Sequence, residues 1–582
     1  MSNKTEIIKS KLFRYIVTFL IFASISIIIQ SYQISRQSFL LGADSFWHMN
    51  RIYEAMMQIR NNNYSYFISI YGFEQSARIV NALYGPGMSY VLGVFLLFTG
   101  SWVRFQIVTS FLINIISAFG IYRILRMVKV KYNISIMLSV LYMTYWHVIA
   151  FNLRGGFFSF AAMIVPYVLY YAFEVNYKKN FNYIGLGLVM AIAVQTHMFT
   201  ALLAAVALFP LFIIALKKDN FRYIFSRVYL AVGIALILSL NFWYGFFSIM
   251  SNNNIILTSP RDLADGAISF FVQNPQSQRN LGLVFTLILL GYIAYVFVSG
   301  KSKISMIDYK ITIVATIFLF ISSRFFPWSV VNILIPPIRS LLQFPSRIIV
   351  VPIILVLVLL GITIENIKNE KICKFSIILL SIGIILQIGI AQNQILQQSN
   401  IFSGVNVIDD RNTTINTGIT NSELRAMFRS SNPSDAIVAM NKPTPDYLPV
   451  GHNEVNVHNY TQFNAWGQFR DQIINNREGF TYEVINGGIE VSWTSIDADT
   501  IQLPIIVYSG TKVELNNEVI NHPDTTDIGS LIVQPEIGEN IVRITYPTGN
   551  LFGLLIKCTI ILFPIFIVLS MLYSYKLKEN KN

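Results

Sequence analysis

The chain has 582 residues, of which 54% are hydrophobic and 13% are charged, and its mean hydropathy is +0.54. This composition excludes an ordinary soluble domain and predicts an α-helical polytopic membrane protein. The net charge of +13 would by itself suit a nucleic-acid-binding protein, but residues 401–550 hold 18 acidic and 8 basic residues, so the positive charge belongs to the rest of the chain. Short cytoplasmic loops collect Lys and Arg, so this asymmetry places the two regions in different compartments. We therefore expect membrane lipids, and no nucleic acid, as partners.

Apolar segments long enough to cross a bilayer occur up to residue 393 and once more near the C-terminus. Lys9, Lys11 and Arg14 precede the first segment, which predicts an uncleaved anchor with a cytoplasmic N-terminus. We predict about twelve transmembrane helices, at residues 12–29, 102–124, 134–152, 157–173, 182–197, 199–216, 228–250, 280–299, 311–325, 347–365, 373–393 and 552–574. The basic connectors and the basic tail then all face the cytoplasm, as the positive-inside rule requires.

The apolar segment 83–100 is left out of this assignment. If it crossed the membrane, the basic stretch 123–131 would face outward and every later loop would invert. We therefore interpret it as a re-entrant or interface-lying segment, whose start is broken by the sequence YGPG.

The assignment divides the chain into three parts. Residues 1–393 are a multi-span transmembrane domain with a long first outer loop, residues 33–101. Residues 394–551 are predicted to be a β-sandwich-like domain outside the cytoplasm, because from residue 487 onward apolar and polar residues alternate between Gly, Asn, Asp and Pro turn signals. Its first part, residues 400–470, is polar and Asn-rich and carries no assignment. Residues 552–582 are a final transmembrane helix and a basic cytoplasmic tail. We expect a multi-pass protein of the plasma membrane with both termini in the cytoplasm.

The stretch LLGADSFWHMNR, residues 40–51, places an acid at the outer end of the first span. His48 and Arg51 follow Asp44 at positions i+4 and i+7, so on a helix the three side chains form one polar stripe. A carboxylate near cationic neighbours stays ionised and can accept a proton from an incoming hydroxyl. In the alternative interpretation, Asp44 caps a short interfacial helix while His48 and Arg51 extend toward lipid headgroups.

Five further polar residues fall on the predicted outer side. Arg154 and Arg347 carry outward guanidinium groups at membrane depth, which suits a lipid-linked phosphate, although anchoring at the headgroup level explains each of them equally well. His197 lies at an outer turn between two helices, where a structural histidine is more common than a catalytic one. Arg339 and Gln343 lie in an outer loop and are predicted to bind either substrate.

The sequence specifies neither a metal site nor a nucleotide site. His48, His147 and His197 are scattered and lack a local ligand pair, and the two cysteines, Cys373 and Cys558, lie at or inside apolar segments. The sequence contains no Gly-rich phosphate loop of the kind that binds nucleotides. We expect no metal ligand among the site residues and no certain cofactor, and the need for a divalent metal ion stays open.

Several stretches, in order over nearly the full length, carry a resemblance to a known family. They are GADSFWH after the first span, RGGFFSFAAMIVP at 154–166, QTHMFTALL at 195–203, LLQFPSRIIV at 341–350, DYLP at 446–449 and the closing IQLPIIVYSGTKVELNNEVI. On these stretches the chain resembles the bacterial YfhO-like membrane proteins, relatives of the C-type glycosyltransferases that use polyprenyl-phosphate sugars. In those enzymes an acid in the first outer loop is the catalytic base or positions the acceptor, and here that position matches Asp44. Similar proteins tend to carry an acid shortly after the RG turn, whereas this chain has Phe158, Ser159 and Phe160, which puts a second catalytic carboxylate there in doubt.

The resemblance implies an integral-membrane glycosyltransferase that transfers a sugar from a polyprenyl-phosphate donor to a cell-envelope acceptor, either teichoic acid or polysaccharide. Asp44 is then catalytic, and the expected substrate-binding residues are His48, Arg51, Arg154, His197, Arg339, Gln343 and Arg347. Two alternatives stay open. A transporter or flippase of lipid-linked glycans would carry charged residues near the midplane of several helices. A non-enzymatic envelope scaffold would have no reason to gather the polar groups at 44, 154, 197 and 347 in one place.

Overall fold

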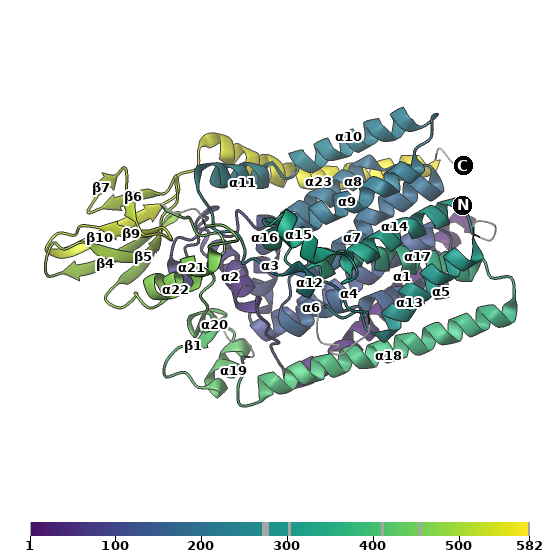
Figure 1. Cartoon of the computed structure of the whole chain (residues 1–582), viewed down its shortest axis with the longest axis horizontal. Coiled ribbons are helices and arrows are strands. Elements are labelled where there is room, and N and C mark those ends of the chain that lie inside the picture. Colours follow the sequence, from purple (N-terminus) through teal and green to yellow (C-terminus); the bar gives the residue numbers. More distant parts are fainter. Residues whose placement is uncertain (1, 271–278, 301–303, 409–411, 452–454, 580–582) are drawn as a thin grey trace.

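The computed structural model describes residues 2–270, 279–300, 304–408, 412–451 and 455–579. Helices predominate in it, and the named strands all lie in the C-terminal third of the chain (Figure 1). The two termini lie at one end of the helix bundle, and the β-sheets lie beyond the other end. The structure confirms the prediction of a mostly helical protein with a β-containing C-terminal region.

Seven helical segments within the described residues are long and apolar enough to cross a membrane. They comprise α1 (Ser2–Arg36), α4 (Trp102–Met127), α7 (Phe158–Phe173) with the turn after it, α9 (Met198–Ala215), α17 (Val350–Glu365) with the turn before it, α18 (Glu370–Ser403) and α23 (Asn550–Glu579). Two bent pairs raise the number to as many as nine: α5 (Tyr132–Met143) with α6 (Trp146–Arg154), and α10 (Phe221–Ile237) with α11 (Leu240–Asn252).

The other three predicted spans correspond to shorter helices. These are α8 (Tyr183–Thr196), α13 (Leu283–Ser299) and α14 (Met306–Ser322), with 14, 17 and 17 residues. At about 1.5 Å per residue they measure roughly 21–26 Å, whereas the hydrocarbon core is about 30 Å thick. Length and composition therefore support seven to nine spans in the described part of the chain, and twelve stays a prediction.

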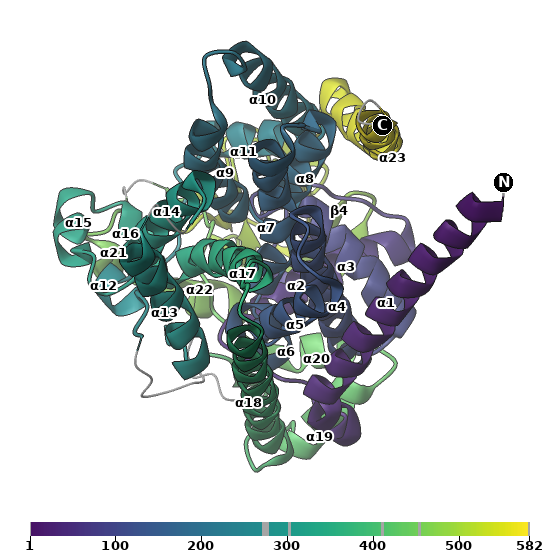
Figure 2. The same cartoon turned by 90° about the vertical axis from the view of Figure 1, so that its right-hand side faces the viewer.

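Central and peripheral helices differ in how they are buried. Viewed along the bundle, α7 and α17 lie near its centre, while α1, α10, α18 and α23 lie at its edge (Figure 2). Apolar side chains on the outer helices are exposed, including Ile382, Ile385 and Leu386 of α18. Exposed apolar surface of this kind suits contact with lipid.

Basic connectors meet at the end of the bundle that holds the termini. Lys131, after α4, pairs with Glu365 at the end of α17 (3.1 Å), and the next residue, Tyr132, lies 3.1 Å from the Thr18 hydroxyl of α1. The side-chain amide of Asn180 donates to the carbonyl of Leu577 in α23 (3.3 Å). These contacts place several of the predicted cytoplasmic connectors on one side of the molecule.

The segment 83–100 forms α3 (Pro86–Thr99), a 14-residue helix that follows Gly85 in the left-handed conformation (φ 84°). It packs on α2 (Ser45–Asn61), the helix of residues 33–101, which are predicted to be the first outer loop. A Cβ atom on Gly93 would stand 2.8 Å from the amide nitrogen of Met56, so only glycine permits this approach. With a length of about 21 Å, α3 is too short to cross a bilayer alone.

The C-terminal strands form two antiparallel sheets. The five-stranded sheet has the order β3-β4-β10-β6-β7 and the three-stranded sheet the order β5-β9-β8. Their bounds are β3 (Thr481–Ile485), β4 (Gly488–Ser495), β5 (Ile501–Ile506), β6 (Lys512–Leu515), β7 (Glu518–Ile520), β8 (Asp524–Thr525), β9 (Ser530–Val533) and β10 (Gly538–Thr545). Val491 lies opposite Val542 in the register of β4 and β10, and both are fully buried, as alternation along a half-buried strand predicts.

Short helices connect α18 to these sheets. They are α19 (Asn421–Arg429), α20 (Ser434–Val438), α21 (Tyr460–Phe463) and α22 (Ala465–Phe469), and a two-stranded ribbon joins β1 (Thr414–Ile415) to β2 (Met440–Asn441). Thr420 begins α19 with a capping box, because its side chain accepts from the amide of Glu423 while the Glu423 carboxylate accepts from the Thr420 amide.

The first outer loop and the sheets share one hydrophobic core. Phe67 and Ile79 of the loop are buried in the same cluster as the apolar residues of β4 and β10. The ring of Phe67 stacks on Tyr546, with centroids 4.4 Å apart, and the Ile506 amide donates to the carbonyl of Ser76 (2.8 Å). The C-terminal region is therefore fixed on the loop that carries α2.

Candidate functional site

Asp44 lies at the N-terminus of α2, and its side chain makes no capping hydrogen bond there. The side chain of the neighbouring Ser45 makes the hydrogen bonds at this point instead. Its hydroxyl oxygen accepts from the Gly42 amide (2.7 Å) and donates to the carbonyl of Arg154 (2.5 Å). The exposed carboxylate of Asp44 is thus not used to hold the helix end.

The RGG turn at the end of α6 meets α2 at this point, although the two stretches are 109 residues apart in the chain. A Cβ atom on Gly42 would stand 2.5 Å from the Cβ of Arg154. Gly155 has a φ of +60°, and a Cβ there would lie 2.7 Å from the Ser45 hydroxyl. The two backbones touch, so Arg154, whose side chain is exposed, lies beside Asp44.

Arg51 is fully buried and connects α2 to the turn before α3. Its guanidinium donates to the carbonyls of Tyr84 (3.1 Å) and Gly85 (3.4 Å), to the Ser89 hydroxyl (2.8 Å) and to the Asn81 side chain (3.1 Å). The guanidinium carbon also lies 4.3 Å from the centre of the Tyr84 ring. These contacts make Arg51 a positioning residue that fixes the ring of Tyr84 above α2.

His48 is buried among rings. It stacks on Phe157 with centroids 4.5 Å apart, and its Nδ1 lies 3.3 Å from a terminal guanidinium nitrogen of Arg51. Burial, followed by the charge of Arg51, lowers the pKa of His48 well below its ordinary value, so this imidazole is neutral at neutral pH.

His197 begins α9, as its position between two helices predicts. Its Nδ1 accepts from the Thr200 amide (3.2 Å), so the neutral ring carries its proton on Nε2. The ring lies 5.1 Å from Tyr84 and 6.3 Å from Phe158, measured between centroids. His197 therefore combines a capping role with a place in the same aromatic group as His48.

Arg347 lies in the 3-10 turn that begins the α17 span, over the rings of Phe344, Phe199 and Phe158 at 5.1, 5.8 and 6.0 Å. It interacts electrostatically with Asp44 and with Tyr84. Within the described residues its buried Nε–H has no hydrogen-bond partner. A buried guanidinium donor without a partner among the described residues is suited to an anionic ligand.

The DYLP turn brings a second carboxyl group, Asp446, to this place. Burial raises the pKa of Asp446 to about 6; the guanidinium of Arg78 opposes this shift, and the nearby Asp44 reinforces it. Lys442 donates to the carbonyl of Ala43, and Arg78 donates to the carbonyl of Asp446. Neither Asp446 and Lys442, which lie near Asp44, nor Arg78, which contacts Asp446, is among the site residues predicted from the sequence.

Arg339 and Gln343 make their contacts with a different loop, which contains Ser259 and Arg261. The Arg261 amide donates to the carbonyl of Arg339 (3.1 Å), and the side-chain amide of Gln343 donates to the carbonyl of Ser259 (2.9 Å). The described hydrogen bonds therefore assign these two residues to holding the loop around residue 260.

Glu54, another acid of the first outer loop, has a structural environment. Its carboxylate is buried and accepts from the amides of Ile70, Tyr71 and Gly72 and from the Gln58 side chain, at 2.7–3.0 Å. It organises the loop that packs on the sheets. No group of three His, Cys, Asp or Glu side chains that could hold a metal ion occurs in the described part of the chain.

Comparison of the chain with protein-family models and with curated proteins finds no match. The candidate site therefore rests on geometry. Asp44, Arg154, His197 and Arg347 come from four separate helix ends and gather around the N-terminus of α2 and the ring of Tyr84.

Proposed function

We propose that this protein is an integral-membrane glycosyltransferase of the YfhO-like kind, which transfers a sugar from a polyprenyl-phosphate donor to a cell-envelope acceptor. One observation carries the proposal: Asp44, which does not cap α2, interacts electrostatically with Arg347, whose Nε–H has no partner in the described structure. A free carboxylate and an unpaired guanidinium donor are the two groups that such a transfer needs.

The arrangement of the molecule supports an outward orientation for this site. Asp44, Arg154, His197 and Arg347 form the α2 cluster. Helix α2 lies toward the β-sheets, away from the end where the termini and several basic connectors lie (Figure 1). Under the positive-inside rule the basic end is cytoplasmic. The site then faces the outer leaflet of the plasma membrane, and as many as twelve helices cross that membrane.

The proposed reaction assigns a role to each group. Arg347, with Arg154 at the edge of the site, holds the donor phosphate, and Asp44 accepts the proton of an acceptor hydroxyl as its oxygen attacks the anomeric carbon. The bond between that carbon and the phosphate oxygen breaks, and polyprenyl phosphate leaves with its negative charge beside Arg347. His48 and His197 line the site, while Arg51 positions Tyr84, and Arg339 and Gln343 position an outer loop for substrate.

A deletion strain tests the proposal. Without the gene, one sugar substituent should disappear from a cell-envelope polymer, and the wild-type gene but not the Asp44→Asn gene should restore it. An unchanged sugar content of every envelope polymer in the deletion strain would contradict the proposal. It would favour the scaffold alternative, which gives no account of the gathered polar groups.

A further inference from the structure

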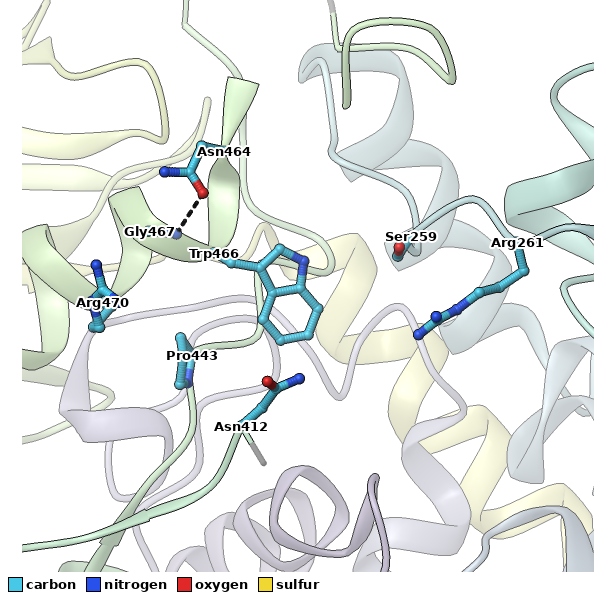
Figure 3. Close-up of a pocket in the computed structure, with 8 residues that line it drawn as sticks. All are labelled: Ser259, Arg261, Asn412, Pro443, Asn464, Trp466, Gly467 and Arg470. Carbon is cyan, nitrogen blue, oxygen red and sulfur yellow. Dashed lines mark hydrogen bonds between the residues drawn. The ribbon is translucent and has the colours of Figure 1, made fainter. Parts of the chain in front are cut away.

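A pocket of about 570 Å³ lies between the loop after α11 and the helical segment that precedes the sheets (Figure 3). Its polar and aromatic lining consists of Ser259, Arg261, Asn412, Asn464, Trp466 and Arg470. The proposed donor chemistry uses none of these side chains.

Trp466 forms the aromatic wall of this pocket. Its partly buried indole lies in the middle of the lining residues, and the guanidinium of Arg261 points toward it from the opposite wall (Figure 3). Asn464 begins α22 in the left-handed conformation (φ 48°), and its side chain accepts from the Gly467 amide (3.3 Å). This cap fixes the short helix, and with it the position of the indole.

Arg261 supplies the charge. The other arginine, Arg470, forms an ion pair with Asp471 (2.9 Å), which leaves Arg261 as the stronger candidate for an incoming anion. Arg339 and Gln343 hold the Arg261 loop through its backbone. A cationic lining is notable here because residues 401–550 carry a net negative charge.

The pocket adjoins the α2 cluster. Pro443 lines the pocket, and the preceding residue, Lys442, donates to the carbonyl of Ala43, next to Asp44. Asp446 interacts electrostatically with both Arg261 and Asp44. Lys442 and Asp446 therefore connect the pocket lining to the segment that carries the proposed base.

We propose that this pocket binds the acceptor, a glycan with an anionic substituent. A sugar ring stacks on Trp466, a phosphate or carboxylate of the glycan pairs with Arg261, and sugar hydroxyls bond to the amides of Asn412 and Asn464. This inference rests on the proposed function, because it names the acceptor of the same site.

Binding to the purified full-length protein tests the inference without any donor. Isothermal titration with maltose 1-phosphate, maltose and inorganic phosphate should show that the sugar phosphate binds at least tenfold more tightly than either of the others. Trp466→Ala and Arg261→Ala should each weaken that binding at least tenfold, and Trp466→Phe, which keeps an aromatic ring, should weaken it less. Arg324→Ala, at an exposed arginine outside the pocket lining, is the matched control and should bind as the wild type does.

Three results would overturn the inference. Equal affinity for maltose and maltose 1-phosphate would show that the pocket does not recognise an anionic substituent. If inorganic phosphate bound as tightly as the sugar phosphate, the pocket would be a site for a free phosphate or a lipid headgroup. Unchanged sugar-phosphate binding by both Trp466→Ala and Arg261→Ala would place the site elsewhere.

The proposed function fails in a different way. If the wild type binds this probe through Trp466 and Arg261 but the deletion strain keeps all its envelope sugars, the inferred glycan site stands while the transferase assignment falls.

Discussion

Gly42 lies directly against Arg154, because a Cβ atom on Gly42 would stand 2.5 Å from the Cβ and 2.8 Å from the carbonyl oxygen of that arginine. This contact fixes the outer end of α6 to the residues that precede α2. It also sets the distance between Arg154 and Asp44, two residues from Gly42 along the chain.

We expect Gly42→Ala to destabilise the protein and to lower transfer activity. The added methyl group overlaps backbone and Cβ atoms that cannot rotate away, and overpacking of this kind costs about 1–3 kcal/mol. Thermal unfolding in detergent measures the loss. Gly233→Ala, in helix α10 where no atom lies within 4 Å of the new Cβ, is the control and should leave the protein as stable as before or slightly more stable.

Arg347→Lys should weaken apparent donor affinity about tenfold while the protein still inserts. Lysine keeps the charge but loses the planar guanidinium, and with it the buried Nε–H that has no partner among the described residues. Titration of the initial transfer rate with donor measures the change. Arg324→Lys, at an exposed arginine, is the matched control; if both variants keep wild-type donor affinity, Arg347 is a headgroup anchor.

The stability of the protein should depend on Asp446 in a defined pH range. Its pKa is about 6 in the folded protein and about 3.8 in the unfolded chain. Between these values the folded state binds more protons, so its stability falls as the pH rises from about 4 to about 6. Asp446→Asn removes this loss, and the variant should gain up to about 3 kcal/mol over the wild type across that range. If the melting temperatures of the wild type and Asp446→Asn changed in parallel between pH 4 and 7, the pKa of Asp446 would not be raised in the folded protein.

Cysteine labelling tests the orientation in a background where Cys373 and Cys558 are replaced by serine. Lys218→Cys, in the exposed connector after α9, should react with an impermeant maleimide only after the cells are permeabilised. Ser431→Cys, in the exposed turn after α19, should react on intact cells. The opposite pattern would place the α2 cluster in the cytoplasm and remove the outer-face function.

The sequence located the apolar helices better than the breaks in their backbone, and seven to nine of the twelve predicted spans have the length and composition of a membrane helix in the described residues. Hydropathy detects apolar residues but not backbone breaks, so the predicted helix 228–250 is in fact α10 and α11, bent by 70° around Leu238 and Ser239.

For the site, helical spacing predicted one polar stripe of Asp44, His48 and Arg51. In the structure His48 and Arg51 are neighbours, with 3.3 Å between their side-chain nitrogens, while Asp44 lies before the first residue of α2. Helical spacing could not show that the N–H groups of Arg51 already donate to the turn at residues 81–89, because those hydrogen bonds depend on how α3 packs. Asp446 was missed because it reaches Asp44 only through the shared core of the first loop and the sheets, and no local pattern encodes that contact.

The decisive variant is Asp44→Asn. Asparagine has nearly the size of aspartate, and the Asp44 side chain makes no capping hydrogen bond, so expression and melting temperature should stay close to those of the wild type. The amide cannot accept a proton from the acceptor hydroxyl, and loss of a general base costs on the order of 10²- to 10⁴-fold in rate. The rate is measured with purified protein and a radiolabelled donor.

Asp265→Asn is the matched control for Asp44→Asn, since Asp265 is an exposed acid of another outer loop. Glu54→Gln does not serve this purpose, because Glu54 accepts hydrogen bonds from three backbone amides. Its replacement should therefore disturb the whole first loop. Wild-type transfer by Asp44→Asn would remove Asp44 from the reaction. Equal losses in Asp44→Asn and Asp265→Asn would mean that the outer surface needs negative charge in general, and only a loss confined to Asp44→Asn identifies one base.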